Sequence, residues 1–474
     1  MAETRVLPAA GCFGPGAWQA TLEASQNALR ELGQDANLAA VAHRLARLVP
    51  DPEASRRLFW ALLGVLVAEG EGHSRVNLEA PAWPEPLARA MGPWAPIRQT
   101  LVNSSLVGTT GTPLILDGGW LASQRLRAAE SSVARAVLAR VAQPRRLATV
   151  PEAVLVAPAN LNAEQRSAVS LALSAPLALI TGRPGTGKTS IVVALLRALQ
   201  RQPEPLPLER ILLAAPTGKA AQRMGEAIRK GLSQLPEPEA LDRALLEDGP
   251  EPRTLHRTLG YHPALGGFRY SPANPLPADL VVVDEASMIG LELLDALLKA
   301  LAPGARLVLL GDAEQLPSVD PGNAFRELVA SQGSATVTLR QSYRMDPRHP
   351  NGRHILMQAE RINDPRRSAE LWGTDGIHQA ATLDSAFGQG GVWLVEPEVP
   401  KHRWMQAFLH RWMQTRVWDG LEAKAWRNRV LEPLQADRNG WRLEDRLRAE
   451  ALLAHFDGFR LLCPVKEGPD LGGV

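Results

Sequence analysis

Lysine and cysteine are scarce in this sequence of 474 residues. Only seven of its 52 basic residues are lysines, and none of them lies in the first 187 residues. In a chain that otherwise uses arginine, a lysine at a motif position carries extra weight. The two cysteines, Cys12 and Cys463, lie far apart and have no cluster of histidines beside them. This excludes a disulfide framework and a zinc site with the usual ligand spacing.

Long apolar runs are also missing. The longest one, Leu58 to Ala68, has about half the length of a membrane span. The N-terminus lacks the basic start and the apolar stretch of a signal peptide. We therefore expect a cytoplasmic protein without a membrane partner. The formal charge of +2 gives no argument for nucleic acid by itself, and the length allows roughly two to four domains.

The first 145 residues show mainly helical periodicity. It is clearest in the segments 29–48, 54–67 and 121–141, whereas TPLILD at 112–117 is a candidate short strand. No catalytic constellation occurs in this region. We predict a mostly helical N-terminal domain over residues 1–145 that serves packing or the docking of a partner.

From about residue 160 the pattern changes to alternating strands and helices. Runs of Val, Leu and Ile predict strands at 176–182, 209–217, 278–286 and 305–312, with helices at 189–200, 218–232 and 289–301 between them. Such alternation predicts a parallel sheet covered on both faces, with ligands at the carboxyl ends of its strands. We expect an α/β domain over residues 146–345. The acidic, proline-rich segment 232–254 is predicted to be a surface insertion.

Residues 182–189, GRPGTGKT, fit the phosphate-binding pattern G-x-x-x-x-G-K-[ST] between a predicted strand and a predicted helix. Such a loop turns its backbone N–H groups toward phosphates, and the helix N-terminus favours negative charge. We expect Lys188 to reach the β- and γ-phosphates and Thr189 to bind Mg²⁺. The predicted contacts to ATP are Gly182, Arg183, Pro184, Gly185, Thr186, Gly187, Lys188, Thr189 and Ser190.

Polar side chains follow the next two strands. Asp284 and Glu285 end one of them, and we expect Asp284 to hold Mg²⁺ while Glu285 accepts a proton from the attacking water. Gln315 follows the other strand and could sense the γ-phosphate and orient water. Taken alone, the residues around Gln315 are equally compatible with a polar loop capped by Pro317.

Five ordered segments resemble the superfamily 1 DNA helicases, and most of all the family of alpha (RecD) subunits of exodeoxyribonuclease V. They are the P-loop, APTGKAA at 215–221, DEAS at 284–287, GDAEQLPSV at 311–319 and LRQSYR at 339–344. The resemblance covers about residues 160 to 345 and implies a RecA-like P-loop NTPase domain with a parallel sheet. It also implies that the residues after 345 begin a second RecA-like domain.

The resemblance implies roles that the residues alone leave open. Gln165, in LNAEQRSAV, looks like the adenine contact, and Arg344 looks like the arginine that contacts the γ-phosphate in the transition state. By itself, Arg344 could be one of many solvated arginines. Thr217, Lys219 and His256 look like contacts to single-stranded DNA, although a histidine at a helix start is an equally good interpretation of His256.

The family resemblance further implies a 5′ to 3′ motor that acts on double-stranded DNA ends together with beta and gamma subunits. About 180 residues precede the P-loop and contain no helix-hairpin-helix repeats, which favours this subunit form over the stand-alone relatives. No carboxylate cluster of a nuclease is present, in agreement with a nuclease centre in the beta subunit. Two other functions stay open: a nucleotide-binding assembly subunit without hydrolysis, and a P-loop ATPase such as a small-molecule kinase.

No segment resembles helicase motifs V and VI, so we expect residues 346–474 to be an incomplete second RecA-like domain and the chain to be truncated. Tryptophans and arginines interleave between residues 392 and 441 and could stack on bases. A common helical face favours core packing instead for Trp404, Met405, Phe408, Leu409, Trp412 and Met413.

Overall fold

The computed structural model of the chain divides into two compact units, Met1–Arg344 and Met345–Val474. It describes residues 15–145, 150, 151, 154, 161–315, 318, 320–343, 350–363, 377–380, 392–395, 401–419, 436, 437, 440–456 and 458. Cys12 and Cys463 lie outside these residues. None of the helices in the described part is long and apolar enough to span a bilayer.

Five helices form the N-terminal part of the first unit around a buried apolar core. They are α1 (Pro15–Glu31), α2 (Asn37–Ala46), α3 (Pro52–Gly70), α4 (Glu85–Met91) and α5 (Trp94–Val102). The central helix, α3, begins where the Asp51 side chain accepts a hydrogen bond from the Ala54 N–H at 2.6 Å. Phe59 and Leu63 of α3 are fully buried in this core.

The predicted helical segment 29–48 is wrong as one element, because it forms the end of α1 and the whole of α2. Gly33 takes a positive φ of 64°, and the Gln34 N–H reaches back to the Leu29 carbonyl at 2.9 Å. This left-handed glycine with its long backward hydrogen bond ends a helix by satisfying its last carbonyl groups. The apolar periodicity continues across this break because both helices bury apolar side chains in the same core.

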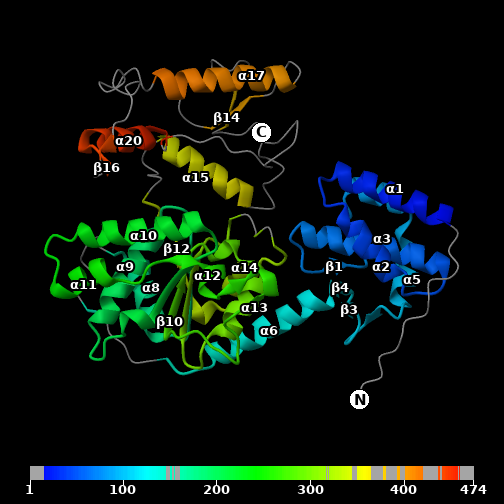
Figure 1. Cartoon of the computed structure of the whole chain (residues 1–474), viewed down its shortest axis with the longest axis horizontal. Coiled ribbons are helices and arrows are strands. Elements are labelled where there is room, and N and C mark those ends of the chain that lie inside the picture. The colour runs from blue at the N-terminus through cyan, green and yellow to red at the C-terminus, as the bar shows by residue number, and fades with distance from the viewer. Residues whose placement is uncertain are drawn as a thin grey trace. The chain divides into compact units, whose positions relative to one another are not determined.

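A small sheet and a long helix follow. The sheet has the order β1-β4-β3-β2, formed by β1 (Val76–Asn77), β2 (Val107–Gly108), β3 (Leu114–Asp117) and β4 (Trp120–Ser123). Helix α6 (Gln124–Val141) then leads to the part with the large sheet (Figure 1). Its Leu126, Val133 and Val137 join the apolar core on one face of that sheet. The domain boundary predicted at 145 remains a proposal, and this packing favours a boundary near residue 123.

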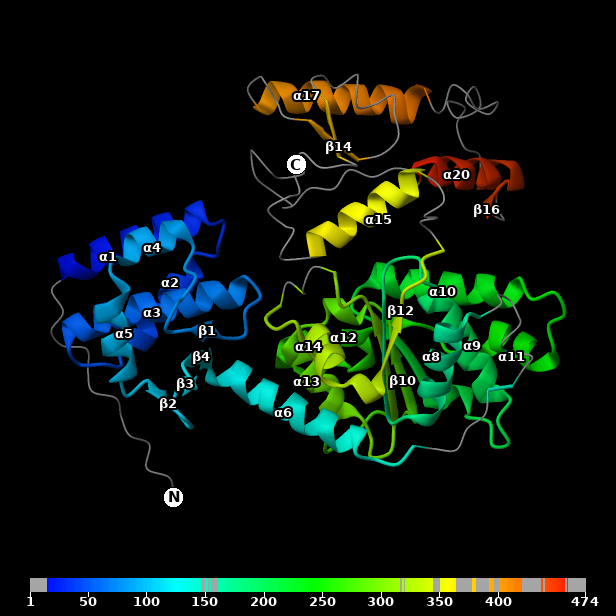
Figure 2. The same ribbon diagram turned by 180° about the vertical axis from the view of Figure 1, so that it is seen from behind.

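The large sheet has six parallel strands in the order β12-β5-β11-β10-β6-β7 (Figures 1 and 2). They are β5 (Leu177–Gly182), β6 (Ile211–Ala215), β7 (Arg253–Thr254), β10 (Leu280–Val283), β11 (Arg306–Gly311) and β12 (Thr336–Leu339). Four of these strands confirm the predicted ones, although β6 and β10 are shorter than their apolar runs. The RecA-like α/β fold expected from the sequence is confirmed.

Two apolar cores lie on the two faces of this sheet, because side chains alternate along each strand. Ala178 and Ile180 face the core that also holds α8 (Ala163–Ser174), α9 (Lys188–Gln200) and α10 (Gly218–Ser233). Leu177 and Leu179 face the opposite core with α6, α12 (Leu255–Thr258), α13 (Leu291–Ala300) and α14 (Ala324–Ser331). Burial on both faces explains why the strands appear in the sequence as continuous apolar runs.

The segment 232–254 is more than the surface insertion predicted from its composition. It contains α11 (Ala240–Asp248), whose Asp242 is buried against α9. The Asp242 carboxylate accepts hydrogen bonds from Arg197 Nε and Arg201 Nη2, both at 2.8 Å. Burial by itself raises the pKa of Asp242, but the hydrogen bonds from the two arginines hold that pKa below its ordinary value.

Replacing Asp242 with asparagine should therefore lower the free energy of unfolding by about 3 kcal/mol, because the buried Arg197 loses its counter-charge and Arg201 keeps only its pair with the exposed Glu239. Urea unfolding at pH 7 measures this loss. Asp248→Asn, at the exposed end of the same helix, is the matched control and should change stability little. A loss for Asp242→Asn no larger than that of the control would show that this buried network does not hold α11 in place.

The second unit contains helices α15 (Pro350–Asn363), α17 (Lys401–Trp412) and α20 (Leu443–Phe456) and a parallel strand pair, β13 (Ile377–Ala380) with β14 (Val392–Val395). Its assignment as the start of a second RecA-like domain remains a proposal. The rings of Trp404 and Phe408 stack with centroids 5.3 Å apart. Met405, Leu409 and Met413 are exposed, so the predicted core face is wrong for these three residues.

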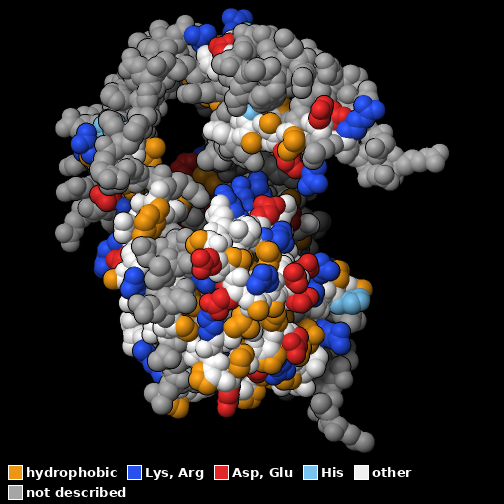
Figure 3. Space-filling model, turned by 90° about the vertical axis from the view of Figure 1, so that its left-hand side faces the viewer, with side chains coloured by type: hydrophobic (Ala, Val, Ile, Leu, Met, Phe, Trp, Pro, Cys, Tyr) orange, Lys and Arg blue, Asp and Glu red, His pale blue; other side chains and the backbone are white. Residues whose placement is uncertain are grey.

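Charged side chains of both signs are interspersed over the coloured lower part of the face shown in Figure 3, which is viewed from the side of α10 and α11. Positive and negative side chains thus lie close together on this face, in line with the small net charge of the chain. A mixed surface produces no long-range field of one sign. Binding of a charged ligand therefore has to come from local arrangements of residues.

Candidate functional site: a phosphate-binding cleft at the sheet edge

The turn between β5 and α9 has the geometry of a phosphate-binding loop. Gly185 and Gly187 take φ values of 81° and 83°, which only glycine adopts without strain. A Cβ atom at Gly187 would lie 2.4 Å from Gln165 Nε2, and one at Gly182 would lie 2.8 Å from Leu339 Cβ. The glycines of the motif are therefore required both by backbone conformation and by space.

Lys188 is the first residue of α9, and its ammonium group lies inside the curl of this loop. Its Nζ donates to the Gly182 carbonyl at 2.6 Å and approaches the Arg183 carbonyl at 3.4 Å. Thr189 and Ser190 occupy the same first helical turn and are partly buried. Unsatisfied N–H groups at this helix start favour a bound anion.

The side chain of Gln165 supports the P-loop through a hydrogen bond. Its side chain is buried, donates from Nε2 to the Thr186 carbonyl at 3.0 Å, and accepts from the Asn162 N–H at 3.0 Å. The latter bond belongs to a capping box that begins α8. The structure thus places Gln165 as a support of the P-loop. Its contact with adenine, expected from the family, stays a prediction.

Asp284 and Glu285 end β10, two strands from β5 in the sheet. The Glu285 N–H donates to the Asp284 carboxylate at 2.9 Å. Burial, strengthened by the negative charge of Glu285, raises the pKa of Asp284 to about 6, although that hydrogen bond and the charge of Lys188 act against the rise. Because the charge of Lys188 acts on Asp284, the structure brings the predicted lysine and acid near each other.

Glu285 has a strained backbone. Its φ of 54° makes it the only residue other than glycine with a positive φ in the described part of the chain. A left-handed backbone is less favourable by on the order of 1 kcal/mol for residues that have a Cβ atom. Such outliers are common at functional sites. Here the left-handed turn at Glu285 ends β10, so that two consecutive carboxylates lie just past the carboxyl end of this strand.

Gln315 lies beside this acidic pair. Its Oε1 accepts a hydrogen bond from the hydroxyl of Ser287, in the DEAS segment, at 3.3 Å. The loop that carries Gln315 begins at Asp312, which is buried, and burial raises the pKa of that carboxyl. The carboxyl ends of β5, β10 and β11 therefore bring together Lys188, Asp284, Glu285 and Gln315.

The predicted DNA contacts lie at neighbouring strand ends, because β6 and β7 pair with Ala215 opposite Thr254. Lys219 and His256 are exposed there. The Thr217 hydroxyl accepts a hydrogen bond from the Ala220 N–H at 3.2 Å and so caps α10, which is a structural role in addition to the predicted one.

Sequence reasoning missed two aromatic residues next to His256. Tyr261 and Phe268 belong to the short antiparallel pair β8 (Tyr261–His262) and β9 (Gly267–Phe268). The His256 ring lies 5.5 Å from the Tyr261 ring and 5.9 Å from the Phe268 ring, between centroids. The alternation of aromatic and basic residues in 256–269 is the signal that could have identified this cluster.

Residues 160–381 match the family model described as AAA domain. The RecBCD enzyme subunit RecD of Mycolicibacterium smegmatis is 39% identical over 321 residues, which are 64% of this chain and 54% of that protein. The ATP-dependent RecD2 DNA helicase of Deinococcus radiodurans is 38% identical over 216 residues, 45% of this chain and 25% of that protein.

Over these segments the chain is similar to RecD-type DNA helicases. It spans about half of the length of the RecD relative that it matches. Among solved structures, the Pif1 helicase from Candida albicans is similar to 48% of this chain and 53% of that chain, with 21% identity and a TM-score of 0.28.

In this chain the segment after β12 is bound to the P-loop. The Tyr343 N–H donates to the Gly185 carbonyl at 2.8 Å, and Asn162 Nδ2 donates to the Tyr343 hydroxyl at 3.0 Å. Tyr343 belongs to LRQSYR, but no role was predicted for it; its ring is exposed beside the loop. Arg344, the predicted γ-phosphate contact, lies outside the described residues.

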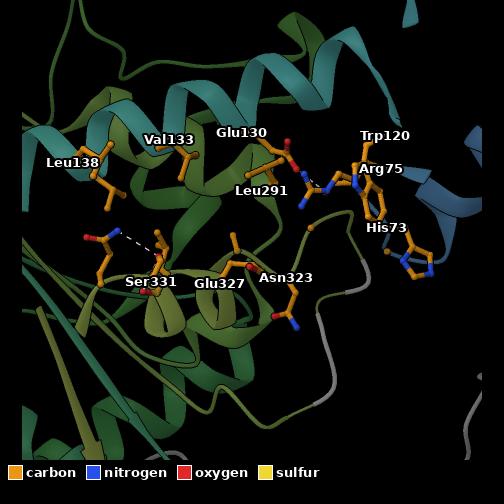
Figure 4. Close-up of a pocket in the computed structure, with 18 residues that line it drawn as sticks. His73, Arg75, Trp120, Glu130, Val133, Leu138, Leu291, Asn323, Glu327 and Ser331 are labelled. Atoms are coloured by element: carbon orange, nitrogen blue, oxygen red, sulfur yellow. Dashed lines mark hydrogen bonds between the residues drawn. The ribbon is translucent and has the colours of Figure 1, made fainter. Parts of the chain in front are cut away.

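A cavity of about 620 Å³ lies apart from the P-loop, between α6, α14 and the loop 72–75. Figure 4 shows Val133 and Leu138 of α6 on one side of it, Glu327 and Ser331 on the other, and Trp120 at one end. None of its lining residues belongs to the P-loop, the acidic pair or the Gln315 loop. The cavity is therefore not the nucleotide site.

Proposed function

We propose that this chain carries the ATP-driven motor domain of a RecD-type DNA helicase subunit. One observation carries the proposal: a P-loop lysine, a partly buried acidic pair and a glutamine loop meet at the carboxyl ends of β5, β10 and β11. This is the edge at which open parallel sheets bind ligands. The similarity to RecD-type helicases supports DNA as the track along which ATP hydrolysis would move the protein.

The residues of the cleft suit ATP with Mg²⁺. Within the described part of the chain, no group of three or more His, Cys, Asp or Glu side chains could enclose a metal by itself. Mg²⁺ needs only one or two protein ligands when phosphates and water supply the rest. Thr189 and Asp284 would hold the ion, which would neutralise charge on the transferring phosphoryl group.

Four side chains would share the hydrolysis step. Lys188 would leave the carbonyl groups of its own loop and bind the β- and γ-phosphates. Glu285 would accept the proton of the attacking water, and Gln315 would orient that water. For Arg344 we keep the role of stabilising the charge that develops on the γ-phosphate.

We propose that the adenine base is held beside Asn162 and Tyr343. The tyrosine ring is exposed and fixed through its backbone and hydroxyl, so one face can stack on a base. Gln165 supports the loop below it and would need to release the Asn162 N–H to accept a hydrogen bond from adenine.

Single-stranded DNA would run along the carboxyl ends of β6 and β7. Lys219 offers a cation to a phosphate, and the cluster of His256, Tyr261 and Phe268 offers rings on which bases can stack. We further propose action on double-stranded DNA ends in recombinational repair, 5′ to 3′ movement, and assembly in the cytoplasm with beta and gamma subunits. The name of the RecD relative, a RecBCD enzyme subunit, supports the assembly.

The test is ATP turnover with and without oligo(dT). Turnover should rise with single-stranded DNA in the wild-type protein. Lys219→Ala should weaken DNA binding several-fold and make it less sensitive to salt, because one phosphate contact is lost. Tyr261→Ala should weaken binding by about 1 to 3 kcal/mol through loss of stacking.

Lys230→Ala is the matched control, because Lys230 is an exposed lysine at the other end of α10. It should bind oligo(dT) like the wild type. ATP turnover that does not respond to DNA would contradict the DNA motor and favour a P-loop ATPase of another substrate class. Tight nucleotide binding without any turnover would favour the assembly subunit.

A further inference from the structure

An ion pair joins the two loops that flank the cleft. Arg183 Nε donates to the Glu314 carboxylate at 2.8 Å. Arg183 is the first variable residue of the P-loop, and Glu314 is the immediate neighbour of Gln315. The side chain before the proposed water-orienting residue is thus bound to the loop that would hold the phosphates.

Most other contacts of the glutamine loop hold its backbone at the start of the turn. The Ala313 N–H donates to the Thr181 hydroxyl at 3.0 Å, and the Glu314 N–H donates to the Asp312 carboxylate at 3.0 Å. The Gln315 side chain itself has a bond of 3.3 Å from Ser287, which is long for a hydroxyl donor and therefore weak. A lateral contact toward the P-loop comes from Glu314.

The Arg183–Glu314 pair is accessible to solvent, so its effect on the position of the loops differs from its effect on the stability of the domain. The side chains of Arg183 and Glu314 are 28% and 49% exposed. An ion pair that is this accessible contributes little to the free energy of folding. A charge-assisted hydrogen bond with this geometry nevertheless restricts where both loops can lie. Loss of the pair should therefore change the placement of Gln315 more than the stability of the domain.

We propose that Arg183 and Glu314 form a positioning pair that holds Gln315 at the distance from the P-loop required for water activation. This inference rests on the proposed ATPase function and deepens it. Neither side chain has to touch the reacting atoms, because the pair acts through the backbone of residues 314 and 315. The pair also joins a P-loop residue to the loop that follows β11. Phosphate binding at the P-loop would therefore affect the position of the loop that carries Gln315.

The decisive experiment combines Glu314→Gln, Arg183→Gln and the charge swap Arg183→Glu/Glu314→Arg. Glu314→Gln should lower kcat for ATP about tenfold and leave KM within about twofold, because placement of water is lost while phosphate binding remains. The swap should recover most of the loss in kcat. Asp279→Asn breaks the similarly accessible pair Arg210–Asp279, 2.7 Å long and 40% exposed on both sides, and should not change kcat.

Hydrogen exchange of the peptide 311–315 with bound ADP supplies a readout that needs no turnover. Exchange should be faster in both single variants than in the wild type and should return toward the wild-type rate in the swap. Wild-type exchange in both single variants, or a swap that is as impaired as the singles combined, would overturn the proposal. Absence of turnover in the wild-type protein would refute the ATPase function, whereas the exchange data would still decide on the pair.

Discussion

Lys188→Ala should reduce ATP turnover at least a hundredfold while leaving the fold intact. The lysine is the one cation inside the curl of the P-loop among the described residues, with its Nζ bound to loop carbonyl groups. Removing a preorganised positive group from a developing phosphate charge typically costs about two to three orders of magnitude in rate. Steady-state ATP hydrolysis with Mg²⁺ and oligo(dT) measures the loss, and thermal unfolding reports on the fold.

Lys299→Ala provides the control for this experiment. Lys299 lies on α13, pairs with Asp295 at 2.6 Å, and is half exposed. Its loss should leave turnover unchanged and stability nearly so, because exposed pairs within a helix contribute little. Turnover of Lys188→Ala within a few-fold of the wild type would mean that this turn does not bind the triphosphate, and the assigned site would be wrong.

Asp284→Asn should abolish turnover and at the same time stabilise the free protein. Burial raises the pKa of Asp284 to about 6, so the folded protein binds a proton there more tightly than the unfolded chain does. Ionisation above pH 6 therefore destabilises the fold, by about 3 kcal/mol at pH 7 to 8 in the absence of Mg²⁺. The neutral amide of asparagine avoids this cost but cannot hold the metal as a carboxylate does.

Urea unfolding without Mg²⁺ should show the stabilisation of Asp284→Asn at pH 8, its decrease between about pH 6 and pH 4, and its disappearance near pH 3, below the unfolded pKa, where the carboxyl is protonated in both folded and unfolded wild-type protein. In the wild type, Mg²⁺-dependent nucleotide binding should weaken as the pH falls below 6. Glu285→Gln is the companion variant: it should lose turnover yet keep Mg²⁺-dependent binding. If Asp284→Asn is no more stable than the wild type at pH 8, the carboxyl is not buried as described.

Some features of the site could be predicted from the sequence because local chemistry dictates them. A P-loop is built from consecutive residues, so GRPGTGKT between an apolar run and a helix identifies its own geometry. The strands of a parallel sheet covered on both faces must be apolar at every position, which made β5, β6, β10 and β11 visible as continuous runs. Asp284 and Glu285 were identified because they end such a run.

Other features depend on residues distant in the sequence. Whether Gln165 meets a base or the loop depended on the packing of α8 under the P-loop. The partners of Asp242 lie more than forty residues earlier, on α9. The acidic, proline-rich composition of 232–254 therefore predicted a solvated insertion, whereas the structure buries Asp242 of this segment against two arginines.

The sequence by itself determined the class of fold, the phosphate-binding turn and the order of the motifs, because each is encoded in a contiguous pattern of apolar, glycine and charged residues. Only the tertiary structure decided which polar side chains meet: Arg183 with Glu314, Lys188 near Asp284, and Tyr343 with Asn162. The physical reason is that the sheet brings the ends of strands far apart in the chain to one edge, and sequence spacing carries no information about which side chains face each other there.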